Sequence, residues 1–128
     1  MDNVGLILVG HGSRLPQHKE SIEKLAEILR STSKFKLVET AYMIRNRPSI
    51  VEALDQMSKR GVKKVVLIPV FMTLGSHTLE DIPKILGLGE GGRVTKWGGM
   101  EVIYGDPLGP DIRIAKIIEE KALEALGE

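Results

Sequence analysis

The chain has 128 residues, the usual size of one domain with one buried core. Its 18 Lys and Arg nearly balance 17 Asp and Glu, so no global charge recruits nucleic acid or an anionic membrane. It has no cysteine, which excludes disulfides, thiolate metal sites and cysteine nucleophiles. We expect one domain over residues 1–128, soluble and cytoplasmic, with no nucleic-acid or membrane partner.

Short β-branched runs alternate with amphipathic segments, a pattern typical of a parallel sheet covered by helices. Strands are predicted over Val4–Val9, within Lys36–Met43, over Val65–Phe71 and near Met100–Tyr104. Helices are predicted from Pro16, from Pro48 to Gly61, from about Leu79 to Leu86, and at the C-terminus, where Ile114, Ile117, Ile118 and Ala122 form an apolar face.

The segment between the third helix and the fourth strand, Gly87–Gly99, is rich in glycine. It is interpreted either as a mobile lid over a pocket or as a flexible connection, with Trp97 as an anchor to the body.

Four βα units are too few for a closed eight-stranded barrel, so an open doubly wound sheet is expected. The predicted fold is α/β and flavodoxin-like, with the strands in the spatial order 2-1-3-4. In such sheets ligands bind beyond the carboxyl ends of the strands, where the winding direction reverses. Here that point lies between the first and third strands.

Two of the three histidines follow those two strands. His11 lies in Gly10-His11-Gly12-Ser13-Arg14, and His77 ends the run Thr73–His77. Imidazole binds nickel, cobalt, zinc or iron and also accepts protons near neutral pH. Two histidines without cysteine would leave a metal site open, so that the ion can be passed on.

The same residues have simpler interpretations. The glycines at positions 10, 12 and 75 either let a broad ligand approach the backbone or only turn the chain, and each histidine alone fits a hydrogen-bonded loop residue. His18 is expected to be an exposed helix residue rather than a third ligand. Three arginines at the predicted edge of the sheet suit either carboxylate binding or solvated charge: Arg14, Arg45 and Arg47.

Several familiar motifs are incomplete. Gly10-His11-Gly12 lacks the third glycine and the acidic partner of a dinucleotide-binding fingerprint. A Walker loop and a serine nucleophile elbow are absent. The incomplete fingerprint argues against a nicotinamide cofactor at the predicted crevice.

The motifs do match one family. The runs Leu8–Arg14, Pro69–Met72, Gly75–Thr78 and Asp81–Pro83 closely resemble the small archaeal class II chelatases of the CbiX-short type. The resemblance covers nearly the whole chain. It implies ATP-independent insertion of cobalt(II) into sirohydrochlorin for cobalamin synthesis, or of nickel(II) for the nickel tetrapyrrole coenzyme of methanogenesis.

The resemblance also implies roles for single residues. His11 and His77 are expected to bind the metal and accept protons, and Gly12, Ser13, Gly75 and Ser76 to line the tetrapyrrole cleft. The metal is then a substrate rather than a permanently bound cofactor. A homodimer is expected, because larger chelatases resemble a fused pair of such units.

Two other functions stay open at this point. A non-catalytic carrier would bind a metal or a tetrapyrrole at the same crevice and deliver it to a partner. A receiver-like interaction domain fits less well, because the acidic cluster after the first strand is missing. The residues do not show whether cobalt or nickel is the physiological metal, since both ions accept imidazole.

Overall fold

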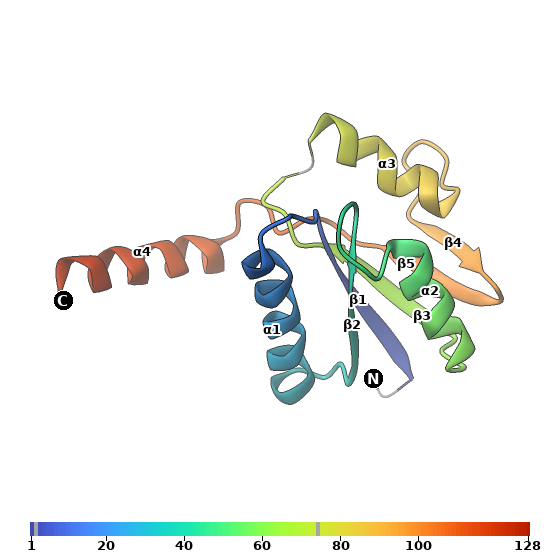
Figure 1. Ribbon diagram of the computed structural model, residues 1–128, viewed down its shortest axis with the longest axis horizontal. Helices are drawn as coiled ribbons and strands as arrows, with labels where there is room; N and C mark the ends of the chain where they lie inside the picture. Colours follow the sequence, from blue (N-terminus) through green and yellow to red (C-terminus); the bar gives the residue numbers. More distant parts are fainter. Residues whose placement is uncertain (2, 74) are drawn as a thin grey trace.

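The computed structural model describes residues 1, 3–73 and 75–128, without the side chains of residues 76–79. The elements in chain order are β1 (Val4–Gly10), α1 (Pro16–Thr32), β2 (Leu37–Tyr42), α2 (Ile50–Lys59), β3 (Lys64–Pro69), α3 (Ser76–Leu86), β4 (Val94–Trp97), β5 (Met100–Tyr104) and α4 (Ile112–Leu126) (Figure 1).

These elements form one sheet in the order β2-β1-β3-β5-β4. The four predicted strands run parallel and have the predicted neighbours, so the expected doubly wound α/β fold is confirmed. The strand β4 was not predicted. It pairs antiparallel with β5 at the edge of the sheet.

The extra strand lies inside the glycine-rich segment. Gly98 and Gly99 both have positive φ and connect β4 to β5, as the two central residues of a tight hairpin turn require. The indole Nε1–H of Trp97 donates to Asp55 Oδ1 of α2 at 2.8 Å, which ties the hairpin to the body as expected. Four of the thirteen residues of the expected lid or connection therefore form a strand.

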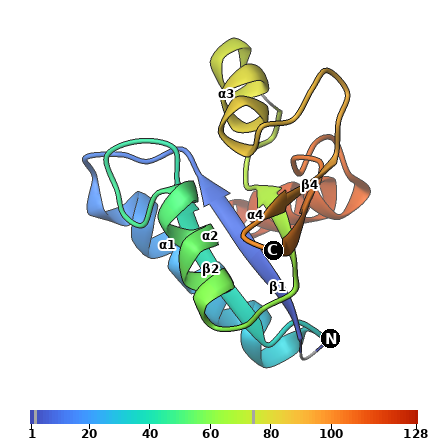
Figure 2. The ribbon, with the colours of Figure 1, turned by 90° about the vertical axis from the view of Figure 1, so that its right-hand side faces the viewer.

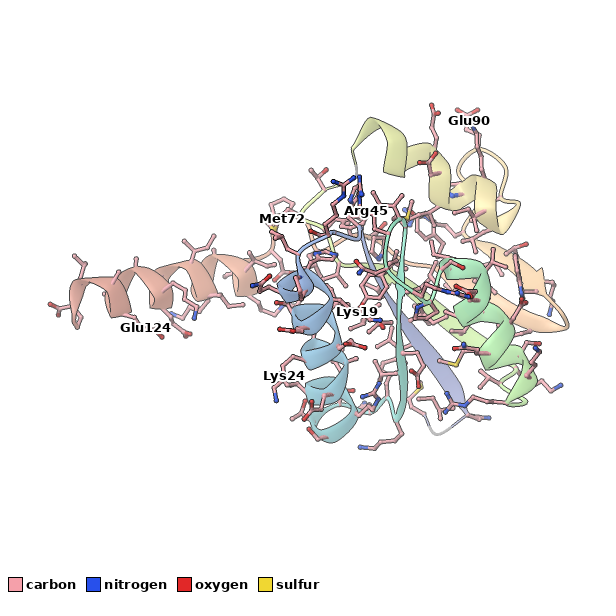
Figure 3. All side chains as sticks on the ribbon, in the orientation of Figure 1. Lys19, Lys24, Arg45, Met72, Glu90 and Glu124 are labelled. Atoms are coloured by element: carbon pink, nitrogen blue, oxygen red, sulfur yellow. The ribbon has the colours of Figure 1, made fainter. Side chains whose placement is uncertain are left out.

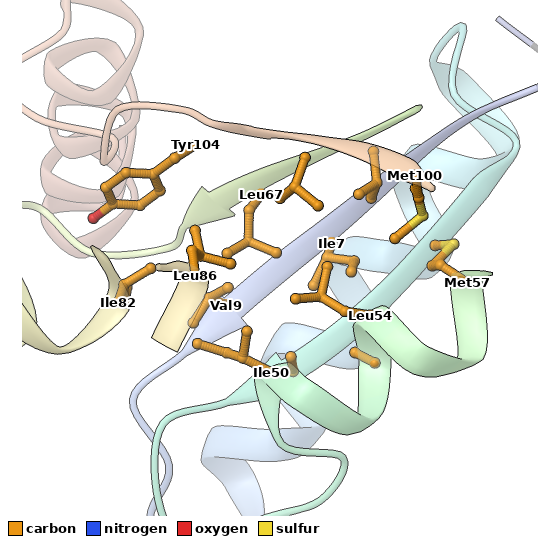
Figure 4. Packing of buried hydrophobic residues seen from close by; sticks show 14 of the residues in the cluster. Ile7, Val9, Ile50, Leu54, Met57, Leu67, Ile82, Leu86, Met100 and Tyr104 are labelled. Atoms are coloured by element: carbon orange, nitrogen blue, oxygen red, sulfur yellow. The ribbon is translucent and has the colours of Figure 1, made fainter. Parts of the chain in front are cut away.

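The helices cover the two faces of the sheet unequally. Helix α1 packs on one face, where Leu6 and Leu8 of β1 meet Ile22 and Ala26. Helices α2 and α3 pack on the opposite face and enclose the larger apolar cluster, which includes Ile7 (Figures 2 and 4). The alternation along β1 follows from the two-residue repeat of a strand buried on both sides.

Helix α2 begins at Ile50 rather than at Pro48. The Ser49 side chain accepts from the backbone N–H of Glu52, and the Glu52 carboxylate accepts from the backbone N–H of Ser49. This reciprocal cap satisfies two free donors at the start of the helix. It also fixes the end of the loop that follows β2.

Helix α4 forms where it was predicted but extends away from the rest of the molecule (Figure 1). None of its residues is buried, and Ile118 is 64% exposed. Its apolar face therefore has no cover in the described chain. No helix among the described residues has the length and apolar character needed to cross a membrane.

Candidate functional site

The segments that follow β1 and β3 lie side by side, as the topology predicted. The backbone N–H of Val70 donates to the carbonyl of Val9 at 2.8 Å. Further along, the His11 ring meets the edge of the Phe71 ring, with 6.3 Å between the ring centres. The exposed His11 imidazole is therefore at the carboxyl end of the sheet, at the winding reversal.

Gly12 places the loop after β1 against the loop after β2. Its φ is +104°, and a Cβ atom there would lie 1.8 Å from the carbonyl oxygen of Ile44. The backbone N–H of Ile44 in turn donates to the carbonyl of His11 at 3.0 Å. Only glycine fits this position.

The space that these glycines leave is filled by the chain itself. A Cβ atom on Gly10 would lie 3.1 Å from both His18 Nε2 and Tyr42 Cδ1. At Gly10 and Gly12 the missing side chains thus allow the loop to pack closely against His18, Tyr42 and Ile44. Ser13, the next residue of this loop, is half-buried.

His18 supports the loop after β1 through a hydrogen bond. The backbone N–H of Gly12 donates to His18 Nε2 at 2.9 Å, so this nitrogen is the unprotonated acceptor and the ring proton lies on Nδ1. The ring also meets the edge of Tyr42, with 6.1 Å between centres. His18 is half-buried, so the expectation of an exposed helix residue was wrong. It positions the loop beside His11.

Asn46 is a contributor that the sequence reasoning missed. Its Oδ1 accepts from the backbone N–H of Ser13 at 2.9 Å and so joins the loops after β1 and β2. Its neighbour Arg45 has φ of 64°, in the left-handed region. An asparagine in a short strand-to-helix loop was the available signal, because its side chain readily bonds to backbone groups.

The three arginines differ in what they contact. Arg47 pairs with Glu52, and this pairing, with the Ser49 backbone N–H, lowers the pKa of Glu52 to about 2. Within the described chain, the guanidinium groups of Arg14 and Arg45 make no ion pair or hydrogen bond. Figure 3 shows Arg45 at the end of the sheet where β1 and β2 finish. Arg14 and Arg45 are therefore the better candidates for an acidic ligand.

His77 is the second residue of α3, which begins at Ser76 rather than near Leu79. The side chains of His77 and Ser76 lie outside the described residues, and Gly75 is exposed. The predicted pair of His11 and His77 therefore stays a prediction. Among the described side chains, no three His, Asp or Glu residues group together to hold a metal.

A cavity of about 450 Å³ lies between α3, the 87–93 loop and the end of β5. Lys84, Arg93 and Tyr104 contribute to its wall, and none of the predicted site residues whose side chains are described does so. The Tyr104 hydroxyl is buried and has no partner in the described structure. Burial raises the pKa of this hydroxyl.

The fold defines the class of the protein: a doubly wound α/β domain in which the segments after the first and third strands meet at the carboxyl end of the sheet. The family model for CbiX matches residues 5–125. The chain belongs to the CbiX family.

Its relatives match along nearly their whole length. It is 37% identical to the sirohydrochlorin cobaltochelatase of Methanopyrus kandleri, over 98% of this chain and 99% of the relative. It is 39% identical to the protein of the same name from Methanothermobacter thermautotrophicus, over 96% and 93% of the two chains.

Solved structures show the same fold. A crystal structure from Marinobacter aquaeolei VT8, assigned as a CbiX protein of cobalamin biosynthesis, is 26% identical with a TM-score of 0.78, covering 97% of this chain and 98% of that one. The sirohydrochlorin chelatase SirB of Bacillus subtilis, in complex with cobalt, is 19% identical with a TM-score of 0.80. That match covers 97% of this chain and 51% of SirB.

Proposed function

We propose that this protein is a sirohydrochlorin chelatase, which inserts a divalent metal ion into the tetrapyrrole ring. The observation that carries the proposal is the nearly full-length identity to sirohydrochlorin cobaltochelatases. Cobalt is the metal in the names of these relatives, and we take cobalt(II) as the substrate ion, with nickel(II) as the alternative. Either ion leaves with the product, so the protein needs no permanently bound metal.

The chemistry begins at the carboxyl end of the sheet. His11 and His77 bind the incoming ion, which exchanges water for imidazole nitrogen. The ion then moves to the pyrrole nitrogens while their protons pass to imidazole, which acts as the general base. The exposed position of His11 beside Phe71 supports this role, because a ring-shaped substrate needs open access from one side.

The acidic periphery of the substrate needs cationic partners. Arg14 and Arg45 are assigned this task because their guanidinium groups are unpaired in the described chain. A guanidinium binds a carboxylate through two parallel hydrogen bonds, which also fixes the orientation of the ring. Arg47, which was a third candidate, is less suited because its guanidinium already pairs with Glu52.

The test is a visible absorption assay of sirohydrochlorin with cobalt(II) or nickel(II) and substoichiometric protein. Conversion of many equivalents per chain, faster than the uncatalysed background, is the expected result. The faster ion indicates the physiological metal. A spectral shift that stops at one equivalent, without turnover, contradicts the proposal and favours a carrier.

Two further parts of the proposal concern where and how the protein works. It acts in the cytoplasm, where its tetrapyrrole substrate is expected to be made. It acts as a homodimer, because one copy is small for enclosing a macrocycle. The fold match to SirB supports this size argument, since one copy corresponds to about half of that chain.

A further inference from the structure

The cavity between α3 and the end of β5 is built from residues that have no assigned role in metal insertion. Pro107 lines it, and the backbone N–H of the next residue, Leu108, donates to the carbonyl of Phe71 at 2.8 Å. The Phe71 ring in turn meets the His11 ring. The cavity and the His11 loop are therefore neighbours, but they share no described side chain.

The cavity has the size and the wall of a small-molecule site. Its volume of about 450 Å³ lies within the range of about 300–1,000 Å³ that is typical of ligand pockets. Most of the wall is apolar, and it includes Pro83, Leu88, Pro107 and the Tyr104 ring. Three glycines of the 87–93 loop leave one side without side chains. A ligand that fits this space needs an apolar body.

The Tyr104 hydroxyl is a hydrogen-bonding group without a partner. The residue is 7% exposed, and its hydroxyl oxygen is buried with no hydrogen bond in the described chain. Figure 4 shows the ring reaching from β5 toward α3, which forms the opposite wall of the cavity. A buried hydroxyl that stays unpaired costs free energy, and buried tyrosines usually find a partner. A ligand oxygen that accepts from this hydroxyl would remove that cost.

The charges around the cavity leave one cation unpaired. Arg93 Nη2 lies 2.7 Å from Asp106 Oδ1, so these two charges compensate each other. Figure 3 shows the Glu90 side chain directed away from the sheet. Lys84 makes no ion pair or hydrogen bond in the described part of the chain, and neither does Glu80, one helical turn before it. Lys84 is therefore the group that can pair with an acidic ligand.

We propose that this cavity binds an organic acid with an apolar body, which pairs its carboxylate with the Lys84 ammonium and accepts a hydrogen bond from the Tyr104 hydroxyl. Two molecules have this chemistry: a free organic acid, and the tetrapyrrole itself through one of its acidic side arms. The proposal does not depend on chelatase activity, and only the second source rests on the proposed function.

The first test locates the binding of 2-naphthoate, a two-ring carboxylate, in two-dimensional amide nuclear magnetic resonance spectra of the full chain. The signals of Gly91, Gly92 and Gly105, which line the cavity, are expected to shift, while that of Gly12 in the His11 loop stays in place. 2-Naphthamide has the same body without the charge, and it is expected to bind about 10-fold more weakly. Shifts confined to other parts of the chain, or equal binding of the two probes, overturn the proposal.

The second test changes the charges and measures 2-naphthoate binding by calorimetry. Lys84→Gln is expected to weaken binding about 10-fold, the loss of one charge-assisted hydrogen bond. Lys96→Gln is the matched control, because this lysine of β4 is exposed and lies outside the cavity wall. Glu80→Gln is expected to tighten binding, since it removes a like charge. Unchanged affinity in Lys84→Gln, or weaker binding in Glu80→Gln, overturns the proposal.

Tyr104→Phe distinguishes a hydroxyl that binds a ligand from one that stabilises the fold. The variant is expected to lose several-fold in affinity for 2-naphthoate. Its unfolding temperature should equal or exceed that of the wild type, because the hydroxyl has no partner to lose. A lower unfolding temperature with unchanged affinity would mean that the hydroxyl serves the fold, and it overturns the proposal.

Competition with metal-free sirohydrochlorin identifies the source of the acid. Displacement of 2-naphthoate, with shifts of both Gly12 and Gly105, supports the proposal and assigns the cavity to an arm of the tetrapyrrole. Binding of both molecules together also supports it and assigns the cavity to a separate organic acid. Sirohydrochlorin binding and metal insertion without any binding of 2-naphthoate overturn this inference and leave the proposed function intact.

Discussion

The two histidines predicted to form the site lie on segments that are held in different ways. His11 lies on a loop fixed by residues distant in sequence, since Gly12, His18 and Asn46 each join it to another part of the chain. His77 lies in the first turn of α3, where the position of its backbone follows from the local helix. The comparison teaches that one histidine depends on tertiary contacts, and the other mainly on where a helix begins.

The largest expected effect comes from removing either imidazole. His77→Ala and His11→Ala are each expected to lower the rate of metal insertion by about 100-fold or more, the usual contribution of a general base. Both variants should unfold at the wild-type temperature, because the lost groups serve chemistry. Stopped-flow absorption with cobalt(II) measures the rate. Full activity in His77→Ala would remove its assigned role and leave His11 alone.

The second largest effect is expected in the loop that carries His11. Gly12→Ala is expected to destabilise the fold by about 2–3 kcal/mol, because a side chain at positive φ is strained and its Cβ would strike Ile44. Gly61→Ala is the matched control: φ is +82° there, but nothing lies within 4 Å of the new Cβ. Chemical denaturation compares the two. Equal losses would mean that the contact with Ile44 is unimportant.

The arginines give an intermediate effect. Arg45→Gln is expected to raise KM for sirohydrochlorin about 10-fold, equivalent to losing one charge-assisted hydrogen bond, with kcat unchanged. Arg47→Gln serves as the control, because its guanidinium is paired with Glu52 and should matter less for the substrate. Steady-state kinetics separates KM from kcat. A larger effect at Arg47 would reverse the assignment.

The smallest effect is expected from the hydrogen bond that joins the loop after β1 to the loop after β2. Asn46→Ala removes the acceptor for the Ser13 N–H and is expected to cost about 1 kcal/mol of stability. Insertion should also slow several-fold, because His11 sits two residues away from Ser13. Asn3→Ala, at an exposed turn, provides the control for both measurements. Unchanged activity in Asn46→Ala would show that the His11 loop keeps its position without this tether.

The parts that the sequence predicted are those with regular periodicity. The parallel strands are short runs of apolar residues, and the apolar residues of the helices recur at helical spacing. From these two patterns the fold, and the sheet edge that carries His11, could be predicted. The start of α3 was placed too late because its first turn, Ser76-His77-Thr78, has no apolar repeat. The strand β4 was hidden by surrounding glycines that in fact form its turn.

The missed parts of the site depend on contacts between distant residues. The roles of His18 and Asn46 come from hydrogen bonds to the loop after β1, and neither bond follows from local spacing. Gly12 was noticed, but its packing against Ile44 required the three-dimensional arrangement. The amphipathic pattern of α4 was also recognised, yet the pattern alone did not show that the helix extends away from the sheet.

Trp97 gives the protein a built-in optical reporter. It is the single tryptophan in the sequence, and its indole N–H bonds to Asp55 where the β4–β5 hairpin meets α2. Its emission therefore reports one junction rather than an average over the molecule. Loss of that bond exposes the half-buried indole to water, so the emission maximum should move to longer wavelength when the hairpin detaches.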